Sequence, residues 1–332
     1  MINISQKLNP KLFDKDVEQI PIRKGFGEGL LLAGEKNESI VGLSADLTES
    51  TQMHLFKNKF PERYIEVGIA EQNLASVASG LSAMGKIPFI SSFAAFSPGR
   101  NWEQIRTTIC YNNRPVVIVG SHSGFSDGAD GGTHQSLEDI ALMRVLPKMT
   151  VISPCDSIEA KKATVASAEL GGAVYIRLLR EKTPVITTED SPFEIGKARL
   201  YYGEEDVKAD VGIVATGSLV FKALKVAETL KKENISAKVL SVTTIKPIDS
   251  ESIISLAKTC GAIVTVEEHQ IACGFGSAVA EVLVQNFPVP IEFIGVKDMF
   301  GQSGTPNELL EHYEIGENHI LYASKKVIGR KN

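Results

Sequence analysis

The sequence predicts an α/β protein of two domains, each a mostly parallel sheet covered by helices. Short runs of β-branched and other apolar residues alternate with amphipathic stretches almost throughout the chain. This alternation is typical of parallel strands joined by helices that cover both faces of the sheet. With 332 residues, the chain is long enough for about two domains that each bury a core.

Two series of apolar runs are expected to form the strands of the two sheets. The first series comprises Ile40–Leu43, Ile87–Ser92, Val116–Ser121, Thr150–Ile152 and Ala173–Leu178. The second comprises Val211–Ala215, Lys238–Val242, Ala262–Val266 and Ile291–Val296.

Helical patterns lie between these runs, and the clearest covers Glu71–Met84. Its apolar residues recur on one face at the spacing of a helix: Leu74, Val77, Ala78, Leu81 and Met84. The other expected helices are Arg23–Ala33, Asn101–Asn112, Ser157–Glu169, Ser218–Lys232 and Asp249–Thr259.

A polar stretch, Glu181–Tyr202, separates the two series and contains two prolines, several threonines and an acidic pair. Such a composition favours a linker. We therefore expect one domain over residues 1–188 and a second over residues 189–332.

Composition and charge exclude several classes of protein. The formal net charge is −5 and no basic stretch occurs, so we expect no nucleic-acid partner. No window holds about 18 uninterrupted apolar residues, and the N-terminus lacks the apolar core of a signal peptide, so we expect no membrane association. The four cysteines lack C-x-x-C spacing, which favours free thiols and a cytoplasmic protein.

Glu71 opens the clearest helix, within YIEVGIAEQNLASVASGLSAMG. The helix dipole favours a carboxylate in the first turn, so Glu71 needs no further role. Small residues recur around it from Gly68 to Gly80, however, and they allow another chain or a ligand to approach closely. Both interpretations stay open on the residues alone.

Phe93 and Phe96 follow an expected strand in PFISSFAAFSPGRNWEQIR. Phenylalanine is ordinarily a core residue. The carboxyl ends of parallel strands are also where open sheets bind ligands, and two flat rings there offer apolar walls to a planar heterocycle.

A glycine-rich polar loop, GSHSGFSDGADGGTHQ, carries His122, Asp127, Asp130 and His134. Ordering such a loop has a large entropic cost, and titratable groups gathered after a strand indicate an active site. A surface loop capped by its aspartates is the alternative. The spacing of His122, Asp130 and His134 matches no standard ligand motif, and the G-x-x-x-x-G-K-[ST] pattern is absent, so no metal site is predicted in this chain.

Three further candidates are Arg23 in PIRKGFGEGL, Ser50 in SADLTEST and Arg180 in YIRLLREKTP. A lone surface arginine is ordinarily just solvated. Two arginines and a serine are suited to hold a phosphate. Nothing in their spacing brings them together.

In this order, from about Ile22 to about Ile315, these segments resemble the C-terminal half of transketolase, a thiamine-diphosphate enzyme. SADLTEST resembles the family's G-A-D-L-T-x-S segment, EVGIAEQN its catalytic-glutamate segment and SSFAAF its cofactor-ring segment. DGADGGTHQ resembles the substrate-loop signature D-G-P-T-H-Q, and VTVEEHQIACGFGSAV resembles the family's glycine-rich turn. The resemblance implies a pyrimidine-binding domain followed by a transketolase C-terminal domain.

For the cofactor, the resemblance implies that Glu71 hydrogen-bonds N1′ of the aminopyrimidine and so promotes loss of the thiazolium C2 proton. Phe93 and Phe96 match residues that pack on the aminopyrimidine. Asp46 matches an aspartate near the thiazolium cation, and Leu47 is assigned to the same cofactor site.

For the substrate, the resemblance implies that His122 and His134 contact hydroxyls and assist proton transfer, which makes them catalytic together with Glu71. Asp130 matches the residue that reads the hydroxyl beside the carbonyl. The contacts to the substrate phosphate are matched by Arg23, Ser50 and Arg180.

The implied reaction transfers a two-carbon ketol unit from a ketose phosphate to an aldose phosphate. The G-D-G…N segment with which transketolases hold magnesium and diphosphate is absent from the sequence. The resemblance therefore implies that Mg²⁺ (or Ca²⁺) is bound mainly by a separate N-terminal transketolase subunit, in an α₂β₂ heterotetramer. Two positions depart from the family: Gly99 stands where several transketolases have a tyrosine, and Gly132 replaces a proline of the substrate loop, which should loosen it.

Three alternatives remain open. The β-subunit of a 2-oxo-acid dehydrogenase shares the two-domain layout, but DGADGGTHQ is closer to enzymes of sugar phosphates. A 1-deoxyxylulose-5-phosphate synthase shares the loop but normally carries both halves on one longer chain. A non-catalytic scaffold of the same fold would have little reason to keep the whole set of candidate site residues.

Overall fold

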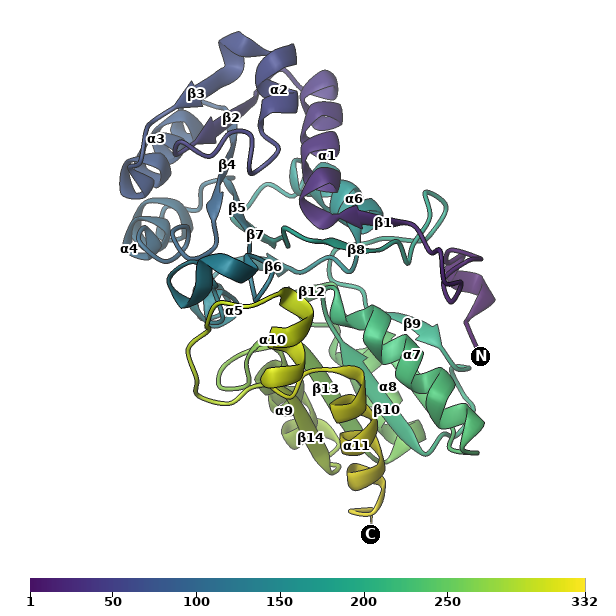
Figure 1. Ribbon diagram of the computed structural model, residues 1–332. Coiled ribbons are helices and arrows are strands. Elements are labelled where there is room, and N and C mark those ends of the chain that lie inside the picture. The colour runs from purple at the N-terminus through teal and green to yellow at the C-terminus, as the bar shows by residue number, and fades with distance from the viewer. Residues whose placement is uncertain (332) are drawn as a thin grey trace.

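The structure is a computed structural model that describes residues 1–331 of the chain. Figure 1 shows two helix-covered sheets, the first above the second. The predicted α/β architecture of two mostly parallel sheets is confirmed.

The first sheet has seven strands in the order β12-β6-β7-β5-β4-β2-β3. All neighbours in it are parallel except the pair formed by β12 and β6. Its strands are β2 (Ile40–Ser44), β3 (Tyr64–Glu66), β4 (Ile87–Phe93), β5 (Val117–Ser121), β6 (Thr150–Ile152), β7 (Val174–Arg177) and β12 (Thr244–Lys246).

The second sheet has five strands in the order β14-β13-β10-β11-β9, and only the pair of β11 with β9 is antiparallel. Its strands are β9 (Arg199–Tyr202), β10 (Val211–Ala215), β11 (Ala237–Ser241), β13 (Ile263–Gln270) and β14 (Ile291–Val296). A separate antiparallel ribbon joins β1 (Gln19–Pro21) to β8 (Lys182–Pro184). The stretch predicted as a linker thus contains two short strands, β8 and β9.

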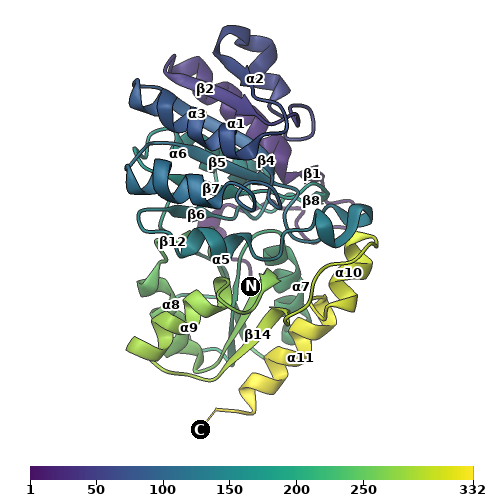
Figure 2. The ribbon, with the colours of Figure 1, turned by 90° about the vertical axis from the view of Figure 1, so that its left-hand side faces the viewer.

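Helices cover both faces of the first sheet (Figures 1 and 2). On one face, α1 (Ile22–Lys36) and α6 (Ser157–Ser167) share a core with β4 and β5. On the other face, α3 (Glu71–Ala83) and the segment from α4 (Trp102–Gln104) into a π-helix (Ile105–Tyr111) pack on β2, β4 and β5. The remaining α-helices are α2 (His54–Lys59), α5 (Asp139–Arg144), α7 (Leu219–Lys232), α8 (Ser250–Cys260), α9 (Phe275–Asn286), α10 (Pro306–His312) and α11 (Glu317–Ile328).

The predicted helix Asn101–Asn112 differs from the structure, which turns from an α-helix into a π-helix at Ile105. The Ser79 hydroxyl of α3 donates to the carbonyl of Thr108 across 2.7 Å. A side chain that bonds a helical carbonyl in this way is a usual cause of a local departure from α geometry.

The two halves share strands and core. β12 comes from the second half of the chain but pairs with β6 of the first sheet. At the other end, Leu8 and Leu12 are buried in the core of the second sheet, and the Asn3 amide donates to the carbonyl of Tyr201 across 2.9 Å. The domain boundary near residue 188 stays a prediction.

None of the helices within residues 1–331 combines the length and apolar character needed to cross a membrane.

Candidate active site

Strand register brings the candidate site residues to one edge of the first sheet. In the parallel ladders, Phe93 at the end of β4 lies opposite Ser121 at the end of β5, and Gly120 lies opposite Arg177 of β7. The segments that follow these strands therefore emerge side by side. Carboxyl ends of parallel strands are the usual ligand-binding edge of an open sheet.

An aromatic cluster forms where β4 and β5 end. The rings of Phe93 and His122 stack with centroids 3.8 Å apart, and Phe96 lies 6.0 Å from Phe93 at an interplanar angle of 20°. The His134 ring meets Phe96 edge-on at 5.3 Å. Both phenylalanines keep part of their surface exposed. The structure thus gathers Phe93, Phe96, His122 and His134 into one cluster.

Glu71 lies at the first position of α3 and is only 4% exposed. Nη1 of Arg100 donates to both of its carboxylate oxygens at 3.2 Å, and the Arg100 guanidinium also lies 4.2 Å from the centroid of the Phe96 ring. Asn101 donates from Nδ2 to the Glu71 carbonyl at 3.0 Å. Sequence reasoning missed Arg100, although its place four residues after Phe96 in the same turn was a usable signal.

His122 is buried and has a left-handed backbone, with φ at 57°. Its Nδ1 is 2.8 Å from the Ser121 hydroxyl. Burial, followed by the positive charges of Arg23, Arg180 and His134, lowers the pKa of His122 to about 3. The imidazole is therefore neutral at neutral pH, and its unprotonated ring nitrogen can accept a hydrogen bond.

The structure brings together Arg23 and Arg180, whose positions in the sequence gave no sign that they lie close to each other. Arg23, in the first turn of α1, donates from Nη1 to the Ser50 carbonyl, while its Nε is buried without a partner among the described residues. Burial and the nearby charge of Arg180 lower the pKa of Arg23. Arg23, Ser50 and Arg180 thus form one cationic corner beside His122.

Asp127 joins this corner, and sequence reasoning gave it no role. Its Oδ1 is 3.3 Å from Nη1 of Arg180, and its Oδ2 is buried without a hydrogen-bond partner among residues 1–331. Burial, and then the neighbouring Asp130, raise the pKa of the Asp127 carboxyl. Asp130 itself is exposed.

Asp46 and Leu47 lie farther along the edge, after β2. Asp46 is exposed, has φ at 59°, and donates its amide to Oε1 of Glu66 at 2.7 Å. The same Glu66 oxygen accepts the Gly68 amide at 2.9 Å, shortly before α3. Within residues 1–331, the hydrogen bonds of Asp46 and Leu47 join them to Glu66, Ser44 and Thr51, not to the aromatic cluster.

The two departures from the family pattern have structural reasons. A Cβ at Gly99 would lie 2.0 Å from the Ala95 carbonyl oxygen, so this backbone admits no side chain there. A Cβ at Gly132 would lie 2.5 Å from the Gly301 carbonyl oxygen, so this glycine allows close packing against the second half.

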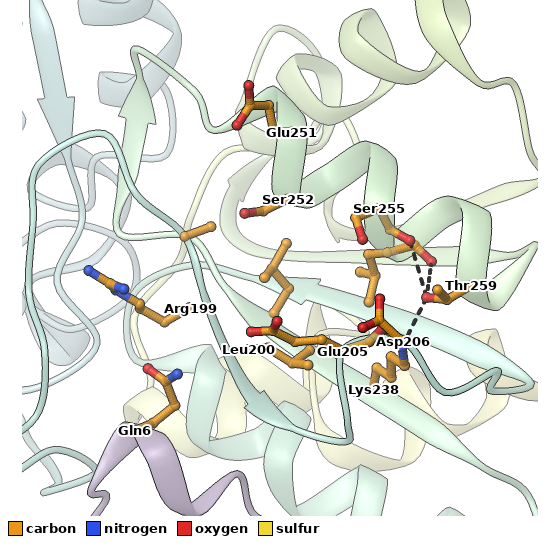
Figure 3. A pocket seen from close by; sticks show the side chains of 13 residues that line it. Gln6, Arg199, Leu200, Glu205, Asp206, Lys238, Glu251, Ser252, Ser255 and Thr259 are labelled. Carbon is orange, nitrogen blue, oxygen red and sulfur yellow. Dashed lines mark hydrogen bonds between the residues drawn. The ribbon is translucent and has the colours of Figure 1, made fainter.

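A hollow of about 300 Å³ lies elsewhere, between β9, β11 and α8 (Figure 3). Lys238 sits in it and donates from Nζ to the Thr259 hydroxyl at 3.0 Å. None of the residues that line this hollow belongs to the aromatic cluster or the cationic corner.

Comparison with known proteins identifies the family. Residues 18–185 match the transketolase pyrimidine-binding domain, and residues 203–320 match the transketolase C-terminal domain. The chain belongs to the transketolase family. The resemblance in the sequence is thereby confirmed.

Similar transketolases include chains of comparable length. The putative transketolase C-terminal section of Methanocaldococcus jannaschii is 45% identical over 90% of this chain and 93% of its own length. The 6-deoxy-6-sulfo-D-fructose transketolase subunit SqwH of Clostridium sp. is 40% identical over 96% and 98%. A solved structure described as a split gene transketolase, inactive beta4 tetramer, is 44% identical, covers 94% of this chain and 100% of its own, and superposes with a TM-score of 0.87.

The transketolase family depends on thiamine diphosphate, and the residues present suit its aminopyrimidine ring. Arg100 already places a planar group with N–H donors against the Glu71 carboxylate and the Phe96 ring. A flat heterocycle with an N–H donor has the same two requirements, namely an acceptor at its edge and an apolar surface at its face. No group of three or more His, Cys, Asp or Glu side chains within the described residues could hold a metal ion.

Proposed function

We propose that this chain is the C-terminal subunit of a two-subunit transketolase that moves a two-carbon ketol unit from a ketose phosphate to an aldose phosphate. The observation that supports the proposal is that the buried Glu71 carboxylate lies close to the Phe96 ring. The planar guanidinium group of Arg100 contacts both, and another planar group could take its place. Thiamine diphosphate, when held by these residues, would supply the carbon nucleophile for the donor carbonyl.

Glu71, Phe93, Phe96, Asp46 and Leu47 are the proposed cofactor contacts. The buried carboxyl group of Glu71 faces the ring nitrogen, and its burial strengthens the hydrogen bond between them. Arg100 has to leave Glu71 and Phe96 for the ring to bind, and its side chain is 52% exposed, which gives it a route into solvent. Asp46, which follows the end of β2, is proposed to place its negative charge near the thiazolium cation.

His122, His134 and Asp130 are the proposed contacts to substrate hydroxyls, and the two histidines the proposed proton carriers. The low pKa of His122 supports the hydroxyl contact, because a neutral imidazole can accept a hydrogen bond from a hydroxyl group. Arg23, Ser50 and Arg180 are the proposed contacts to the anionic end of the sugar. The unpartnered Nε of Arg23 supports that assignment.

The anion itself need not be phosphate. One relative is named for 6-deoxy-6-sulfo-D-fructose, and a sulfonate presents charged oxygens to arginine much as a phosphate does. We propose sugar phosphates as the substrates and test the sulfonate beside them.

We further propose that Mg²⁺ (or Ca²⁺) and the diphosphate are held by an N-terminal subunit with a G-D-G…N segment, in an α₂β₂ heterotetramer. A relative named as a C-terminal section supports a division of the enzyme between two chains. The partly exposed Phe93 and Phe96 leave room for a second chain at the site. A cytoplasmic location stays a prediction; the four cysteines are all unpaired thiols.

The test combines the purified chain with its candidate partner, thiamine diphosphate and Mg²⁺. We expect ketol transfer from xylulose 5-phosphate to ribose 5-phosphate by the pair and none by the isolated chain. Glu71→Gln should lower kcat about 100- to 10,000-fold, because the ring loses its acid–base partner. The matched control is Glu28→Gln on α1, whose carboxylate is 44% exposed and pairs with Lys24.

Activity of the isolated chain would contradict the division between two subunits. Near-normal kcat in Glu71→Gln would remove that residue from the cofactor site. Transfer from 6-deoxy-6-sulfo-D-fructose but not from xylulose 5-phosphate would replace the phosphate assignment while leaving ketol transfer intact.

A further inference from the structure

The substrate loop, residues 121–136, carries His122, Asp127, Asp130 and His134 but is held only in part by its own half of the chain. The Ser123 amide and hydroxyl both donate to the Leu178 carbonyl, at 3.1 and 2.9 Å. The Arg180 amide donates to the Ser126 hydroxyl at 3.1 Å. These bonds fix one side of the loop against the segment after β7.

The other side of the loop is bound by Glu268 on β13 of the second sheet. This buried carboxylate accepts the Phe125 amide at Oε1 across 2.6 Å. A Cβ at Gly124 would lie 2.3 Å from the same oxygen, and Gly124 has φ at 63°. Only glycine lets the backbone pass so close to the carboxylate in this conformation. The loop and Glu268 are therefore fitted to each other.

Further contacts between the loop and the second half of the chain surround the hydrogen bond from Phe125 to Glu268. The Phe125 ring stacks on Tyr313 with centroids 4.5 Å apart. Gln135 donates from Nε2 to the carbonyls of Gly128 at 3.0 Å and Gln302 at 2.9 Å, which ties the loop to the segment before α10. In Figure 1 this segment reaches from the lower half to the upper one.

Glu268 is itself held rigidly. Arg177 of β7 donates from Nη2 to the Glu268 carbonyl at 2.8 Å and from Nε to Asp139 at 2.9 Å. The Ser218 hydroxyl lies 3.4 Å from its second carboxylate oxygen. Because its backbone and side chain are both fixed, the carboxylate is a stationary anchor for the loop.

We propose that Glu268 is a positioning residue of the active site: it fixes the loop at Phe125, three residues from His122, and so sets where His122 meets the substrate. The second half thereby contributes to substrate binding without touching the substrate. The effect on activity rests on the proposed function, whereas the effect on the loop does not.

The first experiment measures amide hydrogen exchange in the isolated chain. In Glu268→Ala the Phe125 amide loses its acceptor, so peptides from residues 121–136 should exchange about tenfold faster or more. Glu268→Gln keeps an acceptor oxygen for Phe125 and should restore protection. The control is Glu267→Gln, the adjacent buried carboxylate, which accepts the amides of Phe275 and Gly276 in α9 and should leave the loop unchanged.

The second experiment uses the assembled two-subunit enzyme. Glu268→Ala should lower kcat/KM for the ketose about tenfold, mainly through KM, while the affinity for thiamine diphosphate stays at the wild-type level. Glu268→Gln should restore KM.

Wild-type loop exchange in Glu268→Ala would overturn the proposal, as would equal loop exchange in Glu268→Ala and Glu267→Gln. Failure of Glu268→Gln to restore KM would do the same. If the wild-type pair transfers no ketol unit at all, the proposed function fails, and the exchange experiment still decides whether Glu268 holds the loop.

Discussion

At the scale of single residues, His122 shows how far surroundings change the chemistry of one side chain. A free imidazole titrates near 6.5, but burial and three neighbouring positive charges lower the pKa of His122 to about 3. The folded chain thus binds a proton here less readily than the unfolded chain. The stability that the neutral ring contributes is fully present above pH 6.5 and is lost as the pH falls toward 3.

We predict that the His122 ring signals do not titrate around pH 6.5 in NMR spectra of the isolated chain labelled at histidine. The charged form would have to lie among Arg23, Arg180 and His134, away from bulk water. His122→Asn assigns the signals. A titration midpoint near the ordinary 6.5 would contradict the burial and charge argument.

Arg23 and Arg100 show what packing adds to single residues. Each is an unremarkable surface arginine in the sequence. In the structure, Arg100 covers the carboxylate and ring proposed for the cofactor, and Arg23 meets Ser50 across 27 positions of the chain.

At the scale of elements, the crossing of α1 and α6 positions one corner of the site. Arg23 lies in the first turn of α1, and that helix packs on α6 through glycines. A Cβ at Gly25 would lie 1.8 Å from the Ser157 carbonyl oxygen. The two backbones are therefore in direct contact at this point.

We predict that Gly25→Ala lowers the free energy of unfolding by about 1–3 kcal/mol, because the added methyl group forces the helices apart. Gly80→Ala is the matched control, since Gly80 lies in α3 and a Cβ there meets nothing within 4 Å. It should raise the free energy of unfolding by about 0.5–1 kcal/mol through helix propensity. Urea denaturation of the isolated chain measures both. Equal stability of the two variants would argue against direct contact of α1 with α6.

At the scale of the whole molecule, the two halves depend on each other. β12 covers the edge of β6, and one continuous core contains Val151 of the first sheet and Val214 and Leu240 of the second. The N-terminal segment packs on the second sheet, as Figure 1 shows for the purple chain end. Separating the halves would expose a strand edge and divide a core.

We therefore predict that the isolated chain unfolds in a single cooperative transition. Trp102, the sole tryptophan, lies in the first half and donates to the Leu142 carbonyl, so its fluorescence reports that half. Far-UV circular dichroism follows the loss of secondary structure in both halves. The two denaturation curves should coincide, and a fragment of residues 1–188 should aggregate. Two separate transitions would show that the halves fold independently.

The sequence by itself determined the fold class, most strands and the family. Strands such as β2, β5 and β10 are buried along their whole length, so they stand out as continuous apolar runs. The candidate residues Glu71, Phe93 and His122 were identifiable because each lies in a short motif at an element boundary. These signals lie within short stretches of the chain, so they can be recognised before the three-dimensional structure is known.

Only the tertiary structure decided what lies far apart in sequence. Helix α9 was not among the helices predicted from the sequence. Its N-cap residue, Gly274, has no side chain to cap it, and its first amides are bound by Glu267 from β13, eight and nine residues upstream. The hydrogen bond between Glu268 and Phe125 spans 143 positions. Contacts of this kind depend on which strands become neighbours and in which register, and that is set by packing of the whole core rather than by any stretch of the chain.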